Sequence, residues 1–222
     1  MEPAATFKSA TLRITEIFHS LQGESRTVGL PTVFVRLTGC PLRCRYCDTA
    51  YAFNGGTQMS QTEILSTVRD YGSRHVTVTG GEPLVQPGCI ELLRELCDLD
   101  YEVSLETSGA LSVADVDPRV SKVLDLKTPA SGECARNLYG NVVYLTAHDQ
   151  VKFVICDRGD YEWTRLKIDE LGLLARVSEV LLSPAFEELD PADLAAWVLE
   201  DGLQVRVQLQ LHKLIWGDKP GV

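Results

Sequence analysis

Residues 39–49 read Gly39-Cys40-Pro41-Leu42-Arg43-Cys44-Arg45-Tyr46-Cys47-Asp48-Thr49, with three cysteines spaced C-x₃-C-x₂-C. The glycine, the proline and the two arginines disfavour regular structure, so we expect a loop that aims three thiolates at one point. Three thiolates at one point bind a soft metal centre. Iron–sulfur clusters usually take four cysteines, structural zinc sites close with four ligands, and no further cysteine or histidine follows nearby. We therefore predict a four-iron cluster in which one iron stays open for a substrate or cofactor.

From the spacing alone, a zinc loop, a disulfide pair with a spare thiol, and unrelated cysteines are alternatives to the cluster. An aromatic residue, Tyr46, directly precedes the last cysteine. Together, the cysteine spacing and Tyr46 resemble the signature of the radical S-adenosylmethionine superfamily. That resemblance implies that the open iron chelates the amino and carboxylate groups of S-adenosylmethionine. Reductive cleavage of this cofactor would then release a 5′-deoxyadenosyl radical.

Composition places the chain among ordinary globular proteins. It has 222 residues, of which 45% are hydrophobic and 23% charged, and a formal net charge of −10 that argues against a nucleic-acid-binding surface. No apolar run approaches the roughly 18 residues of a membrane span, and residues 1–10 lack the apolar core of a signal peptide, so we expect a cytoplasmic protein. The odd number of cysteines fits a reducing compartment. Four cysteines share no metal spacing and are expected in the core: Cys89, Cys97, Cys134 and Cys156.

Segments with the composition of strands alternate with helical segments along most of the chain. This alternation predicts right-handed βαβ units and a parallel sheet. About six parallel strands are too few to close, so the prediction is an incomplete TIM-like βα barrel. We see no internal repeat or linker and expect a single domain over 1–222, with an N-terminal substrate-binding hairpin and a C-terminal tail; residues 128–149 look like an insertion. The predicted strands cover 32–37, 75–79, 102–106, 122–126, 150–155, 179–182 and 204–209, and the helices 60–71, 88–99, 158–171 and 191–200.

Polar turns follow five of these strands. They are residues 40–47, the Gly-Gly-Glu-Pro turn at 80–83, and residues 106–109, 125–127 and 183–186. In βα folds, sites are built at the carboxyl ends of the strands. We therefore expect the five turns to lie together around one site at the carboxyl ends of the strands.

Further motifs indicate which family within the superfamily the chain resembles. The cysteine loop and the Gly-Gly-Glu-Pro turn occur across the superfamily, but the Leu-Gln-Gly-Glu turn at 21–24 and the histidine motif at 210–213 are more specific. With Arg36 and residues 106–109, they resemble the 7-carboxy-7-deazaguanine synthase family nearly end to end. From its residue type alone, Arg36 is either a solvated strand residue or an anchor for a carboxylate.

The resemblance implies a role for each matching residue. Cys40, Cys44 and Cys47 would ligate the cluster and Thr49 would ligate Mg²⁺. His212 would either line the pocket or lie in the core or a subunit interface. Substrate contacts would come from Leu21, Gln22, Gly23, Arg36 and Thr107, with Arg36 binding a carboxylate. Contacts to S-adenosylmethionine would come from Tyr46, Cys47, Asp48, Gly80, Gly81, Glu82, Gly109, Asp125, Leu126, Lys127, Ser183, Pro184, Ala185 and Phe186.

The implied reaction is the radical-mediated ring contraction of 6-carboxy-5,6,7,8-tetrahydropterin to 7-carboxy-7-deazaguanine with loss of ammonia, in queuosine or other 7-deazapurine biosynthesis. S-adenosylmethionine would serve as a cofactor, and Mg²⁺ would hold the substrate carboxylate. The resemblance also implies a homodimer and an electron donor such as flavodoxin.

Two alternatives stay open at this point. A glycyl-radical-enzyme activating enzyme shares the cysteine loop, but it acts on a protein and is not expected to combine the Leu-Gln-Gly-Glu turn with Arg36. A non-enzymatic iron–sulfur or zinc protein would not bind S-adenosylmethionine and leaves the other polar turns unexplained.

Overall fold

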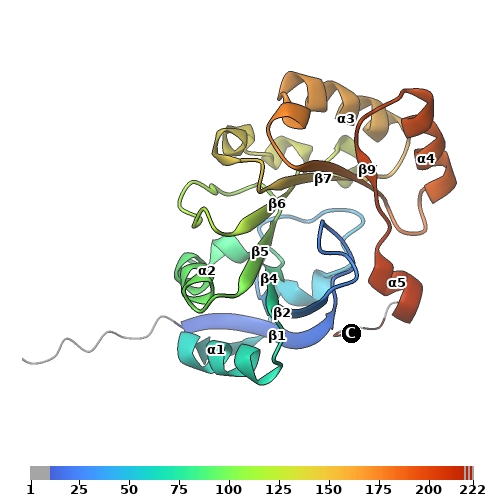
Figure 1. The fold of residues 1–222 in the computed structure, drawn as a ribbon. Helices are drawn as coiled ribbons and strands as arrows, with labels where there is room; N and C mark the ends of the chain where they lie inside the picture. The colour runs from blue at the N-terminus through green and yellow to red at the C-terminus, as the bar shows by residue number, and fades with distance from the viewer. Residues whose placement is uncertain (1–10, 218, 220, 222) are drawn as a thin grey trace, which may run out of the picture.

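The computed structural model describes residues 11–217, 219 and 221. Within them, one sheet has the strand order β3-β1-β2-β4-β5-β6-β7-β8-β9, and β2 and β4 to β9 run parallel to one another. The sheet curves without closing, which is the incomplete βα barrel that the sequence predicts (Figure 1). The strands are β1 (Thr11–Leu21), β2 (Pro31–Leu37), β3 (Thr57–Ser60), β4 (His75–Gly80), β5 (Glu102–Thr107), β6 (Ser121–Asp125), β7 (Gln150–Ile155), β8 (Glu179–Pro184) and β9 (Arg206–Val207).

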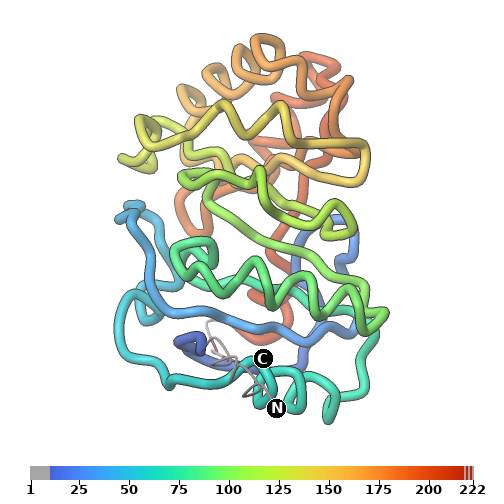
Figure 2. The backbone as a smooth tube through the Cα atoms, turned by 90° about the vertical axis from the view of Figure 1, so that its left-hand side faces the viewer, coloured from blue at the N-terminus to red at the C-terminus, as the bar shows by residue number. Residues whose placement is uncertain are grey.

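Helices cover the outer side of the curved sheet, and Figure 2 shows α1, α2 and α3 following one another along one side of the molecule. A capping box begins α1: the Ser60 hydroxyl accepts from the backbone N–H of Glu63, and the Glu63 carboxylate accepts from the backbone N–H of Ser60 at 2.8 Å. Asp190 caps α4, whose first residue is Pro191. The helices are α1 (Gln61–Asp70), α2 (Gly88–Asp98), α3 (Arg158–Glu170), α4 (Pro191–Glu200) and α5 (Leu211–Trp216).

The main core lies between the sheet and these helices. Inside α2, Cys89 and Cys97 are buried beside Leu92, Leu93 and Leu96, which confirms their predicted core role. Cys156 is also buried. Cys134 is only half-buried, because it lies in a 3₁₀ turn of the 128–149 insertion; the prediction of a core position for it was wrong.

Two edge elements differ from the predicted ones. β3 pairs antiparallel with β1 and was not predicted, since its four residues directly precede α1. The strand expected over 204–209 shrinks to the two residues of β9. The side chain of Gln208 instead binds the loop after β1, where it accepts from the Ser25 N–H at 3.0 Å, and donates to the Ser183 hydroxyl at 3.2 Å.

The loop after β1 lies inside the curve of the sheet (Figure 1). The Leu-Gln-Gly-Glu turn expected at 21–24 does not lie at the surface: Gln22, Gly23 and Glu24 are buried. The Gln22 amide donates to the Thr77 hydroxyl on β4 at 3.1 Å, so polar side chains of the inner face find partners in this loop. Among the described residues, none of the helices has the length and hydropathy needed to cross a membrane.

Candidate active site

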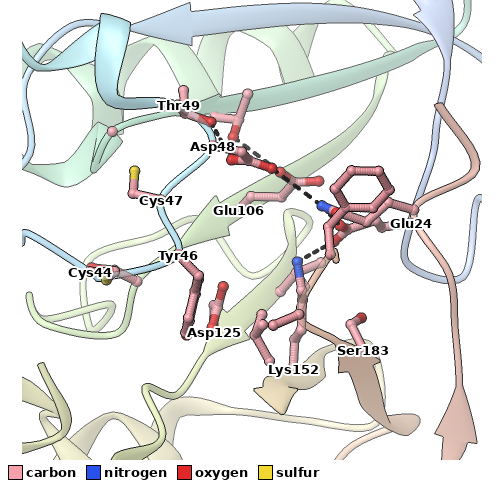
Figure 3. Close-up of a pocket in the computed structure, with 18 of the residues that line it drawn as sticks. Glu24, Cys44, Tyr46, Cys47, Asp48, Thr49, Glu106, Asp125, Lys152 and Ser183 are labelled. Atoms are coloured by element: carbon pink, nitrogen blue, oxygen red, sulfur yellow. Dashed lines mark hydrogen bonds and ion pairs between the residues drawn. The ribbon is translucent and has the colours of Figure 1, made fainter. Parts of the chain in front are cut away.

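A cavity of about 320 Å³ opens at the carboxyl ends of the parallel strands. Side chains from the cysteine loop lie on one side of it, and Glu24 and Lys152 lie on the other (Figure 3). The five polar turns all contribute to its wall, as the sequence predicted. Of the predicted site residues, its wall contains Gln22, Arg36, Cys40, Cys44, Tyr46, Cys47, Asp48, Thr49, Gly80, Gly81, Thr107, Asp125, Lys127, Ser183, Pro184, Ala185, Phe186 and His212.

Five predicted site residues do not line this cavity. Leu21 ends β1, Leu126 is buried in the core and Gly109 packs against it with φ at +71°. A Cβ on Gly23 would lie 2.2 Å from Nδ1 of His212, so this glycine allows the pocket histidine to approach the loop. Glu82 is fully buried.

The three predicted ligand cysteines lie on one irregular loop and are all free thiols. Cys44 and Cys47 are joined by a backbone hydrogen bond of 3.2 Å from Cys47 N–H to the Cys44 carbonyl. Burial raises the pKa of the Cys44 thiol to about 11 and also raises that of Cys40. Metal ligation needs thiolates, so loading a cluster would release protons. All three cysteines line the cavity, and three sulfur donors around one space fit a cluster with one open iron. Within the described residues, no three histidine, cysteine or acidic side chains lie close enough together to hold a single metal ion.

The Gly-Gly-Glu-Pro turn packs directly on the cysteine loop. The Glu82 N–H donates to the Gly39 carbonyl at 2.8 Å. A Cβ on Gly81 would lie 2.5 Å from that carbonyl oxygen and 2.6 Å from the Cβ of Cys40, so the close packing requires glycine. The Glu82 carboxylate accepts from the Thr107 hydroxyl at 2.9 Å and from the Ser108 N–H at 2.7 Å. It therefore ties the turns after β4 and β5 together behind the cavity.

A group of buried charges forms the opposite wall and was missed at the sequence level. Lys152 of β7 pairs with Glu24, and Glu106 of β5 lies nearby. Burial alone would raise the pKa of Glu24, but the charge of Lys152 and the hydrogen bonds from Lys152 and Gln210 together outweigh burial and lower this pKa. Burial raises the pKa of Glu106, and the charge of Glu24 raises it further. The available signal was a lysine inside the apolar segment 150–155.

Two buried polar atoms in the wall have no hydrogen-bond partner within the described protein: the Tyr46 hydroxyl and Oδ1 of Asp125. The other oxygen of Asp125 pairs with Lys127 at 3.0 Å. Buried polar groups are normally satisfied, so these two atoms point to a polar ligand that belongs beside the cysteine loop.

The segment after β9 covers one side of the cavity. The Gln210 amide donates to Glu24 at 2.9 Å and to Asp48 at 3.4 Å. Lys213 lies 3.4 Å from Asp48 and 4.3 Å from the centre of the Phe186 ring. His212 faces the cavity, and burial lowers its pKa. The sequence indicated only His212 in this segment, since the contacts of Gln210 and Lys213 depend on where α5 docks.

Comparison with known proteins agrees with this geometry. Residues 34–125 match the model of the Radical SAM superfamily. The chain is 46% identical over 219 residues to 7-carboxy-7-deazaguanine synthase of Koribacter versatilis, covering 92% of this chain and 97% of that protein. It is also 46% identical to 7-carboxy-7-deazaguanine synthase of Chlorobaculum tepidum, covering 96% and 98%.

A solved structure supports the same fold. The crystal structure of QueE from Escherichia coli superposes with a TM-score of 0.75 at 23% identity, over 91% of this chain and 95% of that one. The superfamily match and the names of the relatives support an enzyme rather than a non-enzymatic iron–sulfur or zinc protein. Sequence, fold and cavity agree, and the chain belongs to the 7-carboxy-7-deazaguanine synthase family of radical S-adenosylmethionine enzymes.

Proposed function

We propose that this enzyme converts 6-carboxy-5,6,7,8-tetrahydropterin to 7-carboxy-7-deazaguanine with loss of ammonia. The observation that carries the proposal is the shared cavity: the cysteine loop, Arg36 and residues of the loop after β1 line the same space of about 320 Å³. A radical source and an anchor for a carboxylate therefore act on one bound molecule.

Cys40, Cys44 and Cys47 would hold the cluster, and S-adenosylmethionine would lie between this loop and the turns after β4, β6 and β8. When bound, these groups supply the radical that removes hydrogen from the carbon bearing the substrate carboxylate. The unpartnered Tyr46 hydroxyl and Asp125 carboxylate oxygen would bind polar groups of the cofactor. Gly80 and Gly81 would face it through their backbone, while Glu82 holds the turn in place.

The substrate would fill the space between Arg36 and the buried charges. Arg36 would bind its carboxylate, since guanidinium groups bind carboxylates with two parallel hydrogen bonds. Gln22, Glu24 and Glu106 offer acceptors and donors for the edge of a pterin ring, and Thr107 lies beside them. His212 and Gln210 would exclude water on the side closed by α5.

Mg²⁺ would bind at Thr49 with an oxygen of the substrate. The Thr49 side chain lines the cavity, and its hydroxyl donates to Asp48 at 2.8 Å. Hydroxyl and carboxylate oxygens are the ligands that Mg²⁺ prefers, and it commonly takes few of them from the protein. We further propose that a flavodoxin-type protein reduces the cluster and that the enzyme acts as a homodimer.

The test is anaerobic. Reconstituted enzyme receives a reductant, S-adenosylmethionine, Mg²⁺ and 6-carboxytetrahydropterin, and mass spectrometry follows the products, with Cys44→Ala as the inactive control. We expect 7-carboxy-7-deazaguanine without stoichiometric 5′-deoxyadenosine. Release of 5′-deoxyadenosine with no deazaguanine product would reject this substrate and favour a different radical reaction, such as the activation of a glycyl-radical enzyme.

A further inference from the structure

Arg36 does not project freely into the cavity. Its Nε–H donates to a carboxylate oxygen of Glu16 at 2.7 Å, and the Tyr51 hydroxyl donates to the same oxygen at 2.8 Å. The side chains of Arg36 and Glu16 are 16% and 21% exposed, so the pair is largely shielded from solvent. Shielding makes a charged hydrogen bond of this kind stronger than the same contact at the surface.

A change of strand register brings the two side chains together. β1 and β2 pair antiparallel, with Ile14 opposite Leu37 but Glu16 opposite Arg36, so one extra residue lies in β1 between these pairs. Without this β-bulge, Thr15 would lie opposite Arg36. Bulges beside active sites commonly re-aim a side chain. Here the bulge places an acid directly across from the arginine, on the face that lines the cavity.

Aromatic rings restrict the guanidinium further. Its central carbon lies 5.7 Å from the centre of the Phe18 ring and 5.8 Å from that of Tyr51. The Phe18 ring is itself stacked on that of Phe34, with the two ring centres 4.9 Å apart. The group is thus held at Nε and packed against two rings. Among the described residues, no protein group accepts a hydrogen bond from its two terminal nitrogens.

We propose that Glu16 is a positioning residue: it holds Arg36 by Nε so that the two terminal nitrogens present a fixed pair of donors to the substrate carboxylate. Bidentate recognition of a carboxylate needs such a planar, oriented pair. The inference rests on the proposed function, because it assumes that the substrate carries a carboxylate next to the reacting carbon. Fixing the side chain before binding lowers the entropy cost of ordering it in the complex.

The test measures carboxylate selectivity instead of turnover. Reconstituted enzyme with S-adenosylmethionine and Mg²⁺ is dialysed anaerobically against 6-carboxytetrahydropterin or against tetrahydropterin, which lacks the carboxylate. The ratio of the two dissociation constants is compared among wild type, Glu16→Ala, Glu16→Gln, Arg36→Ala and the Glu16→Ala/Arg36→Ala double variant. Affinity for tetrahydropterin reports whether each variant keeps an intact pocket.

We expect wild type to prefer the carboxylated ligand and Glu16→Ala to lose about tenfold of that preference, the scale of one charged hydrogen bond. Glu16→Gln keeps an acceptor for Nε and should lose less. In the Arg36→Ala background, Glu16→Ala should change nothing further, because its effect acts through the arginine. Unchanged selectivity in Glu16→Ala would overturn the role of Glu16 but leave the proposed function standing. The same holds if Glu16→Ala lowers the selectivity equally in the presence and absence of Arg36. A wild type that does not prefer the carboxylated ligand overturns the proposed substrate as well.

Discussion

The pair formed by Lys152 and Glu24 provides a quantitative test of the cavity wall. Lys152→Met keeps most of the side-chain volume but removes the cation, and leaves Glu24 and Glu106 buried without it. Removing one partner of a buried ion pair costs about 3–5 kcal/mol. The side chains are 12% and 10% exposed, and Gln210 still donates to Glu24 at 2.9 Å. We therefore expect a loss of about 3 kcal/mol in the free energy of unfolding.

For a domain of this size, that loss corresponds to a melting temperature about 6–12 °C lower. The measurement is thermal unfolding followed by circular dichroism, at matched ionic strength and under anaerobic conditions. Arg74→Met, which breaks an exposed pair with Glu102, serves as the control and should cost less than about 1 kcal/mol. The double variant Lys152→Met/Glu24→Gln removes the unpaired charge and should recover much of the loss.

The loss should also depend on pH. In wild type the pKa of Glu24 is lowered, so its contribution to stability is present at neutral pH and is lost only as pH falls through that low value. Without Lys152, burial is the main remaining influence and raises the pKa of this carboxyl. A carboxyl with a raised pKa favours the folded state below its unfolded pKa, and this contribution is lost as pH rises. The deficit of Lys152→Met should therefore be smaller at pH 5 than at pH 7.5. An equal deficit at both pH values, or a double variant no better than the single one, would refute the reasoning.

Three further substitutions test the other side of the cavity. Cys44→Ala should abolish binding of the cluster, measured as iron and sulfide content, whereas Cys97→Ala in α2 should retain it; equal loss in both would point to misfolding. Gly81→Ala forces a Cβ to within 2.6 Å of the Cβ of Cys40, so we expect several-fold lower iron content, with Gly140→Ala as the matched control because its Cβ meets no atom within 4 Å. Normal iron content in Gly81→Ala would contradict the close packing of the two turns. Thr49→Val removes the proposed Mg²⁺ ligand and should remove most of the stimulation of turnover by Mg²⁺, seen in a titration of the metal; an unchanged response would exclude this site.

Local sequence patterns predicted the elements that depend on local chemistry. The helices expected over 60–71, 88–99, 158–171 and 191–200 and the inner strands expected between residues 32 and 182 all formed close to those ranges. The common position of the five polar turns followed from the rule that the carboxyl ends of parallel strands lie at the same edge of a sheet. The helices and strands could be predicted because each depends on residues a few positions apart, and the turns because each directly follows a strand.

The remaining features depend on pairing over long distances in the chain. The β-bulge that sets Glu16 opposite Arg36 arises from the pairing of β1 with β2, and the sequence of neither strand alone indicates it. Lys152 appears as an interruption of an apolar strand until Glu24, from the first loop, is placed beside it. β9 likewise keeps only Arg206 and Val207, because only these two residues pair with Leu181 and Leu182 of β8. The cysteine side of the cavity is thus local in sequence, whereas the substrate side is assembled from distant parts.

This division has a consequence for biosynthesis. The hydrogen bond between Ser25 and Gln208 spans 183 positions of the chain, so the interior of the barrel cannot be completed until nearly all of these residues have left the ribosome. The βα units between them rely on shorter-range contacts and can fold as they emerge. The cysteine loop is synthesised early, and its three cysteines remain only half-buried in the complete structure. Iron and sulfide can therefore be delivered after synthesis is complete, and the fraction of enzyme that carries a cluster should not depend on the rate of translation.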